Sequence, residues 1–162
     1  MYLGTPGLLI DAFARSALWR MGLNYRHGTG HGVGAALNVH EGPMSISPRL
    51  MITYPLSGGM VVSNEPGYYE DGKFGIRIEN LVTVVEADTP FHFGDAKFFT
   101  FQCLTLHPLQ RSLMWLEDLT EEELAWVNRY HQTVWERVSP RLEAHPEVKE
   151  WLRQKTTHIN RS

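Results

Sequence analysis

Two glutamates of the chain, Glu65 and Glu79, lie at equal distances from Gly72, which follows Asp71 in a typical turn pair. The flanking segments have strand character, and residues equidistant from the turn of an antiparallel hairpin face each other. Two carboxylates held within several ångströms are unfavourable unless a cation lies between them or one of them is protonated. The spacing therefore predicts that both glutamates lie together on one face of a hairpin, with a cation between them or with one of them protonated.

Arg77 adds a basic group to this predicted site. It lies two residues before Glu79, and the period of two in a strand places both side chains on the same face. We expect Arg77 to hydrogen-bond Glu79 or a neighbouring carboxylate and to hold it in position. The alternative is an ordinary Arg and Glu pair on a solvated sheet face.

Three of the chain's eight histidines, His27, His31 and His40, fall in one glycine-rich stretch. Glycine lets the backbone approach an ion closely and lets neighbouring imidazoles converge. Isolated histidines are more often surface or core residues, so this cluster is suggestive only. A phosphate-binding loop is a less favoured explanation, because the Lys-Ser/Thr ending is absent. One imidazole with two carboxylates would suit manganese, cobalt or zinc in hydrolysis, where a metal-bound water supplies hydroxide.

Strand and helix patterns surround these residues. Strands are expected over 60–64, 74–85 and 98–106, with the first two paired as a hairpin. The glycine-rich segment 25–34 is expected to form a shaped loop or an irregular strand, because a helix there would cost too much backbone entropy.

Three helices are expected outside the strands. The first has Thr5 as its N-cap, and its apolar face consists of Leu9, Phe13, Ala17 and Met21. A capping box of Thr120 and Glu123 begins the second helix, and the third begins near Pro146. Mixed elements in this order predict an α+β fold with an antiparallel sheet and terminal helices.

Composition narrows the class of protein. A chain of 162 residues with 43% hydrophobic and 20% charged residues is long and apolar enough to fold as one globular domain. The net charge of −3, without a basic run, gives no reason to expect nucleic acid or an anionic membrane as a partner. The single cysteine, Cys103, excludes an intrachain disulfide and favours a reducing compartment. With no signal-peptide pattern or apolar span, we expect a cytoplasmic protein.

Four ordered motifs closely resemble those of the cytosolic Xaa-Pro aminopeptidases, which are creatinase-like metallopeptidases. These motifs are 27–34 (HGTGHGVG), 38–43 (NVHEGP), 64–69 (NEPGYY) and 75–80 (GIRIEN). The resemblance covers nearly the whole chain. It implies the C-terminal portion of a "pita-bread" fold, with a curved, mostly antiparallel sheet and flanking helices. By this resemblance, residues 1–107 would form the core with the metal site and 108–162 a helical extension.

The resemblance also implies a dinuclear metal site. His31, Glu65 and Glu79 match metal ligands, with Glu79 as the bridging carboxylate. The metals would be two divalent ions, manganese in the first place, with zinc or cobalt as alternatives. Arg77 would hold a ligand carboxylate in position.

The remaining roles concern substrate and proton transfer. His27 and His40 match non-ligand histidines that line the substrate pocket, and His40 would stabilise the tetrahedral intermediate. Glu65 would also carry a proton from the bridging water to the leaving nitrogen. The implied reaction is hydrolysis of the N-terminal Xaa-Pro bond in peptides with proline second.

In one respect the chain departs from the family pattern. The family's other two ligands are aspartates upstream of the first helix, and none of the chain's aspartates lies in such a motif. We therefore expect the chain alone to hold the metal pair incompletely or not at all, and to be inactive. It should also expose apolar surface that favours self-association. The full-length protein is expected to form a homodimer.

Three alternatives remain open. A pita-bread relative can be a non-catalytic binding module, although such proteins tend to lose the ligand residues. A sibling enzyme, prolidase or methionine aminopeptidase, uses the same metal chemistry, although the Gly-Thr-Gly loop and the Tyr-Tyr-Glu-Asp-Gly turn favour aminopeptidase P. An interaction domain would use Trp126, Trp135 and Trp151, which at helical spacing are more often core or dimer contacts.

Overall fold

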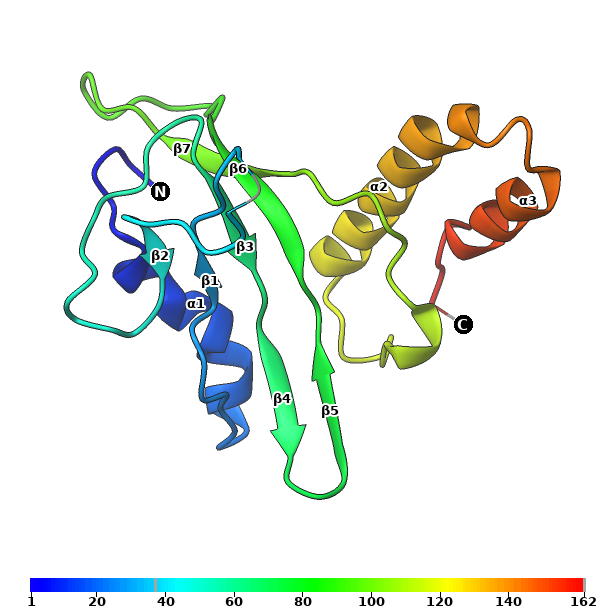
Figure 1. Cartoon of the computed structure of the whole chain (residues 1–162), viewed down its shortest axis with the longest axis horizontal. Helices are drawn as coiled ribbons and strands as arrows, with labels where there is room; N and C mark the ends of the chain where they lie inside the picture. Colours follow the sequence, from blue (N-terminus) through cyan, green and yellow to red (C-terminus); the bar gives the residue numbers. More distant parts are fainter. Residues whose placement is uncertain (37, 162) are drawn as a thin grey trace. The chain divides into compact units, whose positions relative to one another are not determined.

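The computed structural model describes residues 1–36 and 38–161 (Figure 1). The chain divides into two compact units, Met1–Thr105 (unit 1) and a second that begins at Leu106 (unit 2). Among the described residues, no helix combines the length and the apolar character that crossing a membrane requires.

The described part of unit 1 combines one helix with short antiparallel strands (Figure 1). These elements are α1 (Gly7–Arg20), β1 (Gly30–His31), β2 (Ser45–Ile46), β3 (Val61–Asn64), β4 (Gly67–Glu70), β5 (Phe74–Arg77), β6 (Asn80–Glu86) and β7 (Phe99–Cys103). A three-stranded sheet has the order β3-β6-β7, and β1-β2 and β4-β5 form two-stranded pairs.

The hairpin from β3 to β6 keeps one register along its whole length. Asn64 pairs with Asn80, and Gly67 pairs with Arg77, so both ladders are centred on residue 72 as the sequence predicts. Gly72 has a positive φ of 74°, which suits glycine at the turn.

The single strand expected over 74–85 is wrong in one respect, because Ile78 and Glu79 separate β5 from β6. Ile78 N–H donates to the Pro66 carbonyl oxygen at 3.3 Å, but Pro66 has no N–H with which to return the bond. The ladder is therefore interrupted beside Glu65 and Glu79.

The glycine-rich segment forms an irregular strand along β3, within the range of forms expected for it. Glu65 N–H donates to the Thr29 carbonyl oxygen at 2.7 Å, and Val33 N–H donates to that of Val61 at 3.0 Å. A Cβ at Gly30 would lie 1.9 Å from the Ser63 carbonyl oxygen, so only glycine permits this approach.

The first helix differs from its prediction in its cap and in its buried face. The N-cap is Pro6, whereas the Thr5 hydroxyl donates to the Tyr2 carbonyl oxygen. The residues of α1 that are buried are Gly7, Asp11 and Arg15. The predicted apolar face, Leu9, Phe13, Ala17 and Met21, is exposed instead. The helix buries its charged side because these charges find partners there, as described below.

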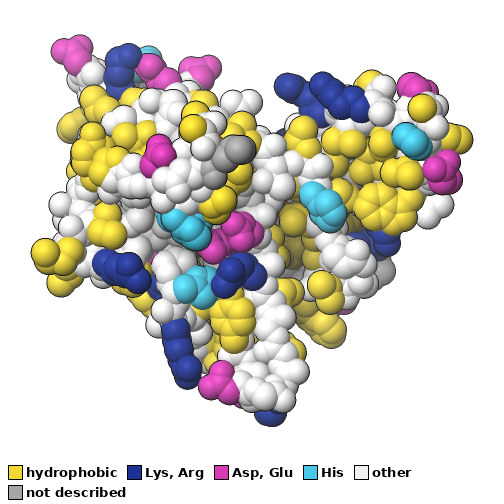
Figure 2. Space-filling model, viewed as in Figure 1, with side chains coloured by type: hydrophobic (Ala, Val, Ile, Leu, Met, Phe, Trp, Pro, Cys, Tyr) yellow, Lys and Arg dark blue, Asp and Glu magenta, His cyan; other side chains and the backbone are white. Residues whose placement is uncertain are grey.

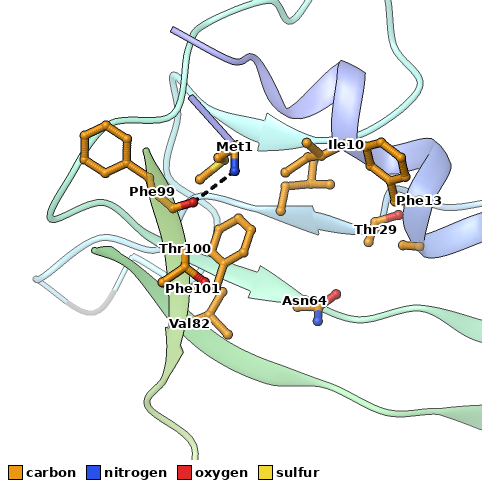
Figure 3. A pocket seen from close by; sticks show the side chains of 11 residues that line it. Met1, Ile10, Phe13, Thr29, Asn64, Val82, Phe99, Thr100 and Phe101 are labelled. Carbon is orange, nitrogen blue, oxygen red and sulfur yellow. Dashed lines mark hydrogen bonds between the residues drawn. The ribbon is translucent and has the colours of Figure 1, made fainter. Parts of the chain in front are cut away.

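The core of unit 1 consists of Ile46, Leu56, Val62, Val82, Val84 and Phe99. Beside it, an apolar cavity of about 360 Å³ lies between α1 and the β3-β6-β7 sheet (Figure 3). Ile10 and Phe13 line it from the helix, and Phe99 and Phe101 line it from β7. The expected exposed apolar surface is therefore present on α1 and around this cavity.

Unit 2 is helical in its described part. Its elements are the 3-10 turns η1 (Arg111–Leu113) and η2 (Ser139–Arg141) and the helices α2 (Glu121–Val138) and α3 (Pro146–Lys155). The capping box of Thr120 and Glu123 is confirmed, with each residue's backbone N–H bonded by the other's side chain. Trp126 stacks on Tyr130, their ring centroids 5.5 Å apart.

Candidate metal centre

Three ligand-type side chains converge in unit 1. His31, Glu65 and Glu79 each offer a donor atom, and these atoms lie within 4.8 Å of one another. Glu65 directly follows β3 and stands between the other two ligands. The glycine-rich segment with Thr29 lies along one side of β3, and β6, which directly follows Glu79, pairs with its other side. The structure thus brings together the three residues expected to bind metal.

The hydrogen bonding of His31 directs a lone pair towards Glu65. Its Nδ1 lies 3.0 Å from the Gly32 carbonyl oxygen, which requires a proton on Nδ1. In the neutral ring, Nε2 is then an acceptor, and it lies 3.2 Å from Glu65 Oε1. Two acceptors at this distance need a cation or a proton between them. The donor set of one imidazole and two carboxylates fits a divalent cation.

Ser63 holds Glu65 and His31 in register. Its hydroxyl donates to Glu65 Oε1 at 2.9 Å and accepts the His31 backbone N–H, also at 2.9 Å. Ser63 is fully buried. Ser63 was not among the residues predicted for the site, although its place two residues before Glu65 on the same strand face is a usable signal.

Arg77 contacts the carboxylate of Glu65. Its Nη1 lies 3.6 Å from Glu65 Oε2, and its Nε donates to the Tyr69 hydroxyl at 2.8 Å. The hydrogen bond to Tyr69, and then the charges of Glu65 and Glu79, raise the pKa of Arg77 above its ordinary value. The expected contact with a carboxylate is present, and it is made with Glu65, the neighbouring carboxylate.

Both predicted pocket histidines lie beside this centre. His27 Nε2 is 2.8 Å from the Tyr69 hydroxyl, and the rings of His31 and His40 have centroids 4.1 Å apart. His27 Nδ1 lies 2.7 Å from the Gly28 carbonyl oxygen, which can only accept, so in the neutral ring Nε2 is an acceptor and the Tyr69 hydroxyl donates to it. Tyr69 therefore joins His27 to Arg77, a role that was not predicted from the sequence.

A pocket of about 500 Å³ opens over these residues. Its lining includes His27, His31, His40, Glu65, Arg77 and Arg49. Histidine, acidic and basic side chains gather on this face of unit 1 (Figure 2). A peptide in the pocket would thus meet imidazoles, a carboxylate and guanidinium groups together.

Comparison with known proteins identifies the family. Residues 2–86 match metallopeptidase family M24, and residues 97–159 match the C-terminal region of peptidase M24. The chain is 58% identical over 149 residues to aminopeptidase P2 of Arabidopsis thaliana, covering 92% of this chain and 21% of that protein. It is 54% identical over 157 residues to a probable Xaa-Pro aminopeptidase P of Coprinopsis cinerea, covering 96% of this chain and 25% of that protein.

A solved structure gives the same picture. The X-prolyl aminopeptidase of Caenorhabditis elegans, described as a cytosolic enzyme with a di-nuclear active site, matches with a TM-score of 0.89 and 40% identity. The match covers 98% of this chain and 26% of that one, so the chain spans about a quarter of the length of such relatives. The α+β pita-bread fold and the resemblance to Xaa-Pro aminopeptidases are confirmed. The chain belongs to metallopeptidase family M24.

Proposed function

We propose that this chain forms part of a metal-dependent aminopeptidase that hydrolyses the N-terminal Xaa-Pro bond of peptides. The observation that carries the proposal is the convergence of His31, Glu65 and Glu79 within 4.8 Å, beside a pocket of about 500 Å³ with two further histidines. The names of its relatives supply the substrate class.

In this proposal, His31, Glu65 and Glu79 hold two divalent ions, of which manganese is favoured over zinc and cobalt. Further ligands come from the rest of a longer protein, since the relatives are about four times as long. When bound, the ions supply a hydroxide nucleophile near neutral pH and polarise the scissile carbonyl.

The chain's own residues bind the substrate and move the proton. Glu65 receives the proton released by the attacking water and delivers it to the leaving proline nitrogen, which carries no hydrogen in the Xaa-Pro amide. His40 donates a hydrogen bond to the developing oxyanion. His27 lines the pocket, and Arg77 restrains the Glu65 carboxylate through their contact at 3.6 Å.

With three ligands only, the chain alone is proposed to be inactive. The whole protein is proposed to be cytoplasmic, since the C. elegans relative is described as a cytosolic enzyme. It is also proposed to act as a homodimer. The division into a core of 1–107 and a helical extension of 108–162 is likewise proposed.

A chimera tests the function. In the C. elegans enzyme, the segment that matches this chain is replaced by residues 1–162. We expect the chimera to cleave a tripeptide with proline second and a chelator to abolish the activity. An Xaa-Pro dipeptide, which a prolidase would prefer, and a peptide beginning Met-Ala, which a methionine aminopeptidase would prefer, should both be poor substrates.

Matched variants assign the activity to the proposed centre. Glu65→Gln and Glu79→Gln should each abolish cleavage by the chimera. Glu86→Gln changes an exposed glutamate that pairs with Lys97 on the surface, and should leave cleavage unchanged. Retention of full activity in Glu79→Gln would contradict the proposed centre. Measurable Xaa-Pro hydrolysis by the isolated chain, abolished by a chelator, would contradict only the proposal that the chain alone is inactive.

A further inference from the structure

A buried ion pair lies on the inner face of α1. Asp11 and Arg15 are each 2% exposed. The Arg15 guanidinium donates to both carboxylate oxygens of Asp11, from Nε at 2.7 Å and from Nη2 at 3.2 Å. Burying two charges is unfavourable unless further hydrogen bonds satisfy them. The remaining partners of this pair belong to the segment that leads into the metal centre.

Arg15 binds the backbone on either side of Arg26. Its Nη1 donates to the Tyr25 carbonyl oxygen at 2.7 Å, and its Nη2 donates to the His27 carbonyl oxygen at 2.7 Å. The guanidinium also lies over the Tyr25 ring, 3.9 Å from its centroid. A lysine cannot reproduce this set of contacts, because its ammonium lacks the planar fork of five N–H groups.

Asp11 holds the same segment two residues further on. Its Oδ1 accepts the Thr29 hydroxyl at 2.7 Å, and the Thr29 oxygen lies 2.5 Å from the Tyr25 hydroxyl. Because the carboxylate paired with Arg15 can only accept, Thr29 donates to Asp11 and Tyr25 donates to Thr29. Thr29 is 1% exposed, so this arrangement lies out of solvent.

Thr29 connects this buried cluster to the metal centre. Its carbonyl oxygen accepts the Glu65 backbone N–H at 2.7 Å. Two residues later, the His31 N–H is held by Ser63 at 2.9 Å. The segment from Tyr25 to His31 is therefore fixed on one side by the charges of α1 and on the other by β3.

We propose that Asp11 and Arg15 are positioning residues for the aminopeptidase site, acting through two separate contacts. Arg15 sets the place of His27 in the substrate pocket through the His27 carbonyl. Asp11 sets the place of Glu65 through Thr29. The inference rests on the proposed function only for the catalytic roles of His27 and Glu65. The contacts that place these two residues lie within this chain and do not depend on it.

The isolated chain tests the placement without metal or substrate. Thr29→Val removes the hydroxyl with little change of shape, and Thr29→Ser keeps it. We expect amide hydrogen exchange at Glu65 to rise by about tenfold in Thr29→Val relative to the amides of β6, and to return towards the parent value in Thr29→Ser. Val84→Ala, a core change away from this cluster, should affect the amides of unit 1 without singling out Glu65.

The chimera tests the consequence for the reaction. Arg15→Lys should raise KM, because it acts on His27, with a smaller change in kcat. Thr29→Val should lower kcat and raise the Mn²⁺ concentration needed for half-maximal activity, and Thr29→Ser should restore both. Each effect should be roughly 10- to 100-fold, as for other outer residues of metal sites. Val84→Ala should lower the Tm with kcat and KM unchanged.

The outcomes separate this inference from the proposed function. If Arg15→Lys and Thr29→Val lower only the Tm, as Val84→Ala does, the ion pair is merely structural and the inference is overturned. If the unsubstituted chimera is inactive, the proposed function fails, and hydrogen exchange at Glu65 in the isolated chain still decides whether the cluster places this residue.

Discussion

His31 Nε2 lies 3.2 Å from Glu65 Oε1, and both atoms are acceptors when the ring is neutral. The Nδ1 contact with the Gly32 carbonyl oxygen fixes this tautomer. We therefore expect His31→Ala in the chimera to lose bound metal and to lower kcat/KM by more than roughly 100-fold, beyond the loss typical of outer residues. Metal analysis after dialysis, with His92→Ala as an exposed control, checks this. Equal metal content in the parent chimera and in His31→Ala would show that His31 is not a metal ligand.

Tyr69→Phe should separate His27 from Arg77. The substitution deletes the hydroxyl that lies 2.8 Å from His27 Nε2 and 2.8 Å from Arg77 Nε. We expect kcat/KM of the chimera to fall by about tenfold, as when other outer residues of metal sites are changed. Tyr54→Phe, also in an exposed part of unit 1, is the matched control. Identical kinetics in the two variants would show that the bridge has no role in the reaction.

Unit 2 should lose stability in mild acid through His131. This residue is 1% exposed, and its Nε2 accepts the Leu109 N–H at 3.1 Å. Burial lowers the pKa of His131 below its ordinary value of 6.5. Below pH 6.5 the unfolded state therefore binds more protons than the folded state. The contribution of neutral His131 to the free energy of unfolding is complete above pH 6.5 and is lost as the pH falls from there towards the lowered pKa.

Urea unfolding of unit 2 at pH 7.5 and pH 5 measures this effect. The urea midpoint should fall between the two pH values in the parent chain, and the fall should be smaller in His131→Gln. The comparison is between two pH values within each variant, so a general loss of stability in His131→Gln does not obscure it. If the urea midpoint of His131→Gln falls as much between the two pH values as that of the parent chain, the loss of stability is caused by other groups.

The isolated chain should self-associate through the exposed apolar side chains on and next to α1. Phe13 and Met21 are 77% and 75% exposed, and Phe13 also lines the apolar cavity. Sedimentation velocity over a range of concentrations should show oligomers whose population Phe13→Gln reduces. Phe91→Gln changes a phenylalanine that is 84% exposed but lies outside α1, and should have little effect. A parent chain that sediments as a monomer throughout would contradict this expectation.

The sequence predicted those features of the site that depend on local periodicity. The Glu65 and Glu79 pairing follows from turn chemistry and the period of two in strands, and both act over a few residues. Tyr69 and the Asp11–Arg15 pair were missed, because their roles depend on contacts with segments distant in sequence. Ser63 was missed although its place two residues before Glu65 is a local signal. For α1, helical spacing predicted that the face with Phe13 is buried. The buried face is instead the one with Asp11 and Arg15, because the loop packed against the helix supplies hydrogen-bond partners for these charges. The break beside Pro66 is a local effect, because this residue has no N–H with which to return the bond from Ile78.

Because the two ladders share one centre, metal binding requires the two arms of the hairpin to have equal length. Asn64 with Asn80 and Gly67 with Arg77 are both symmetric about residue 72. One residue inserted near the tip would leave Glu65 opposite a neighbour of Glu79 whose side chain points to the other face. Natural variants that lengthen this hairpin without losing the metal site would have to add the same number of residues to both of its strands.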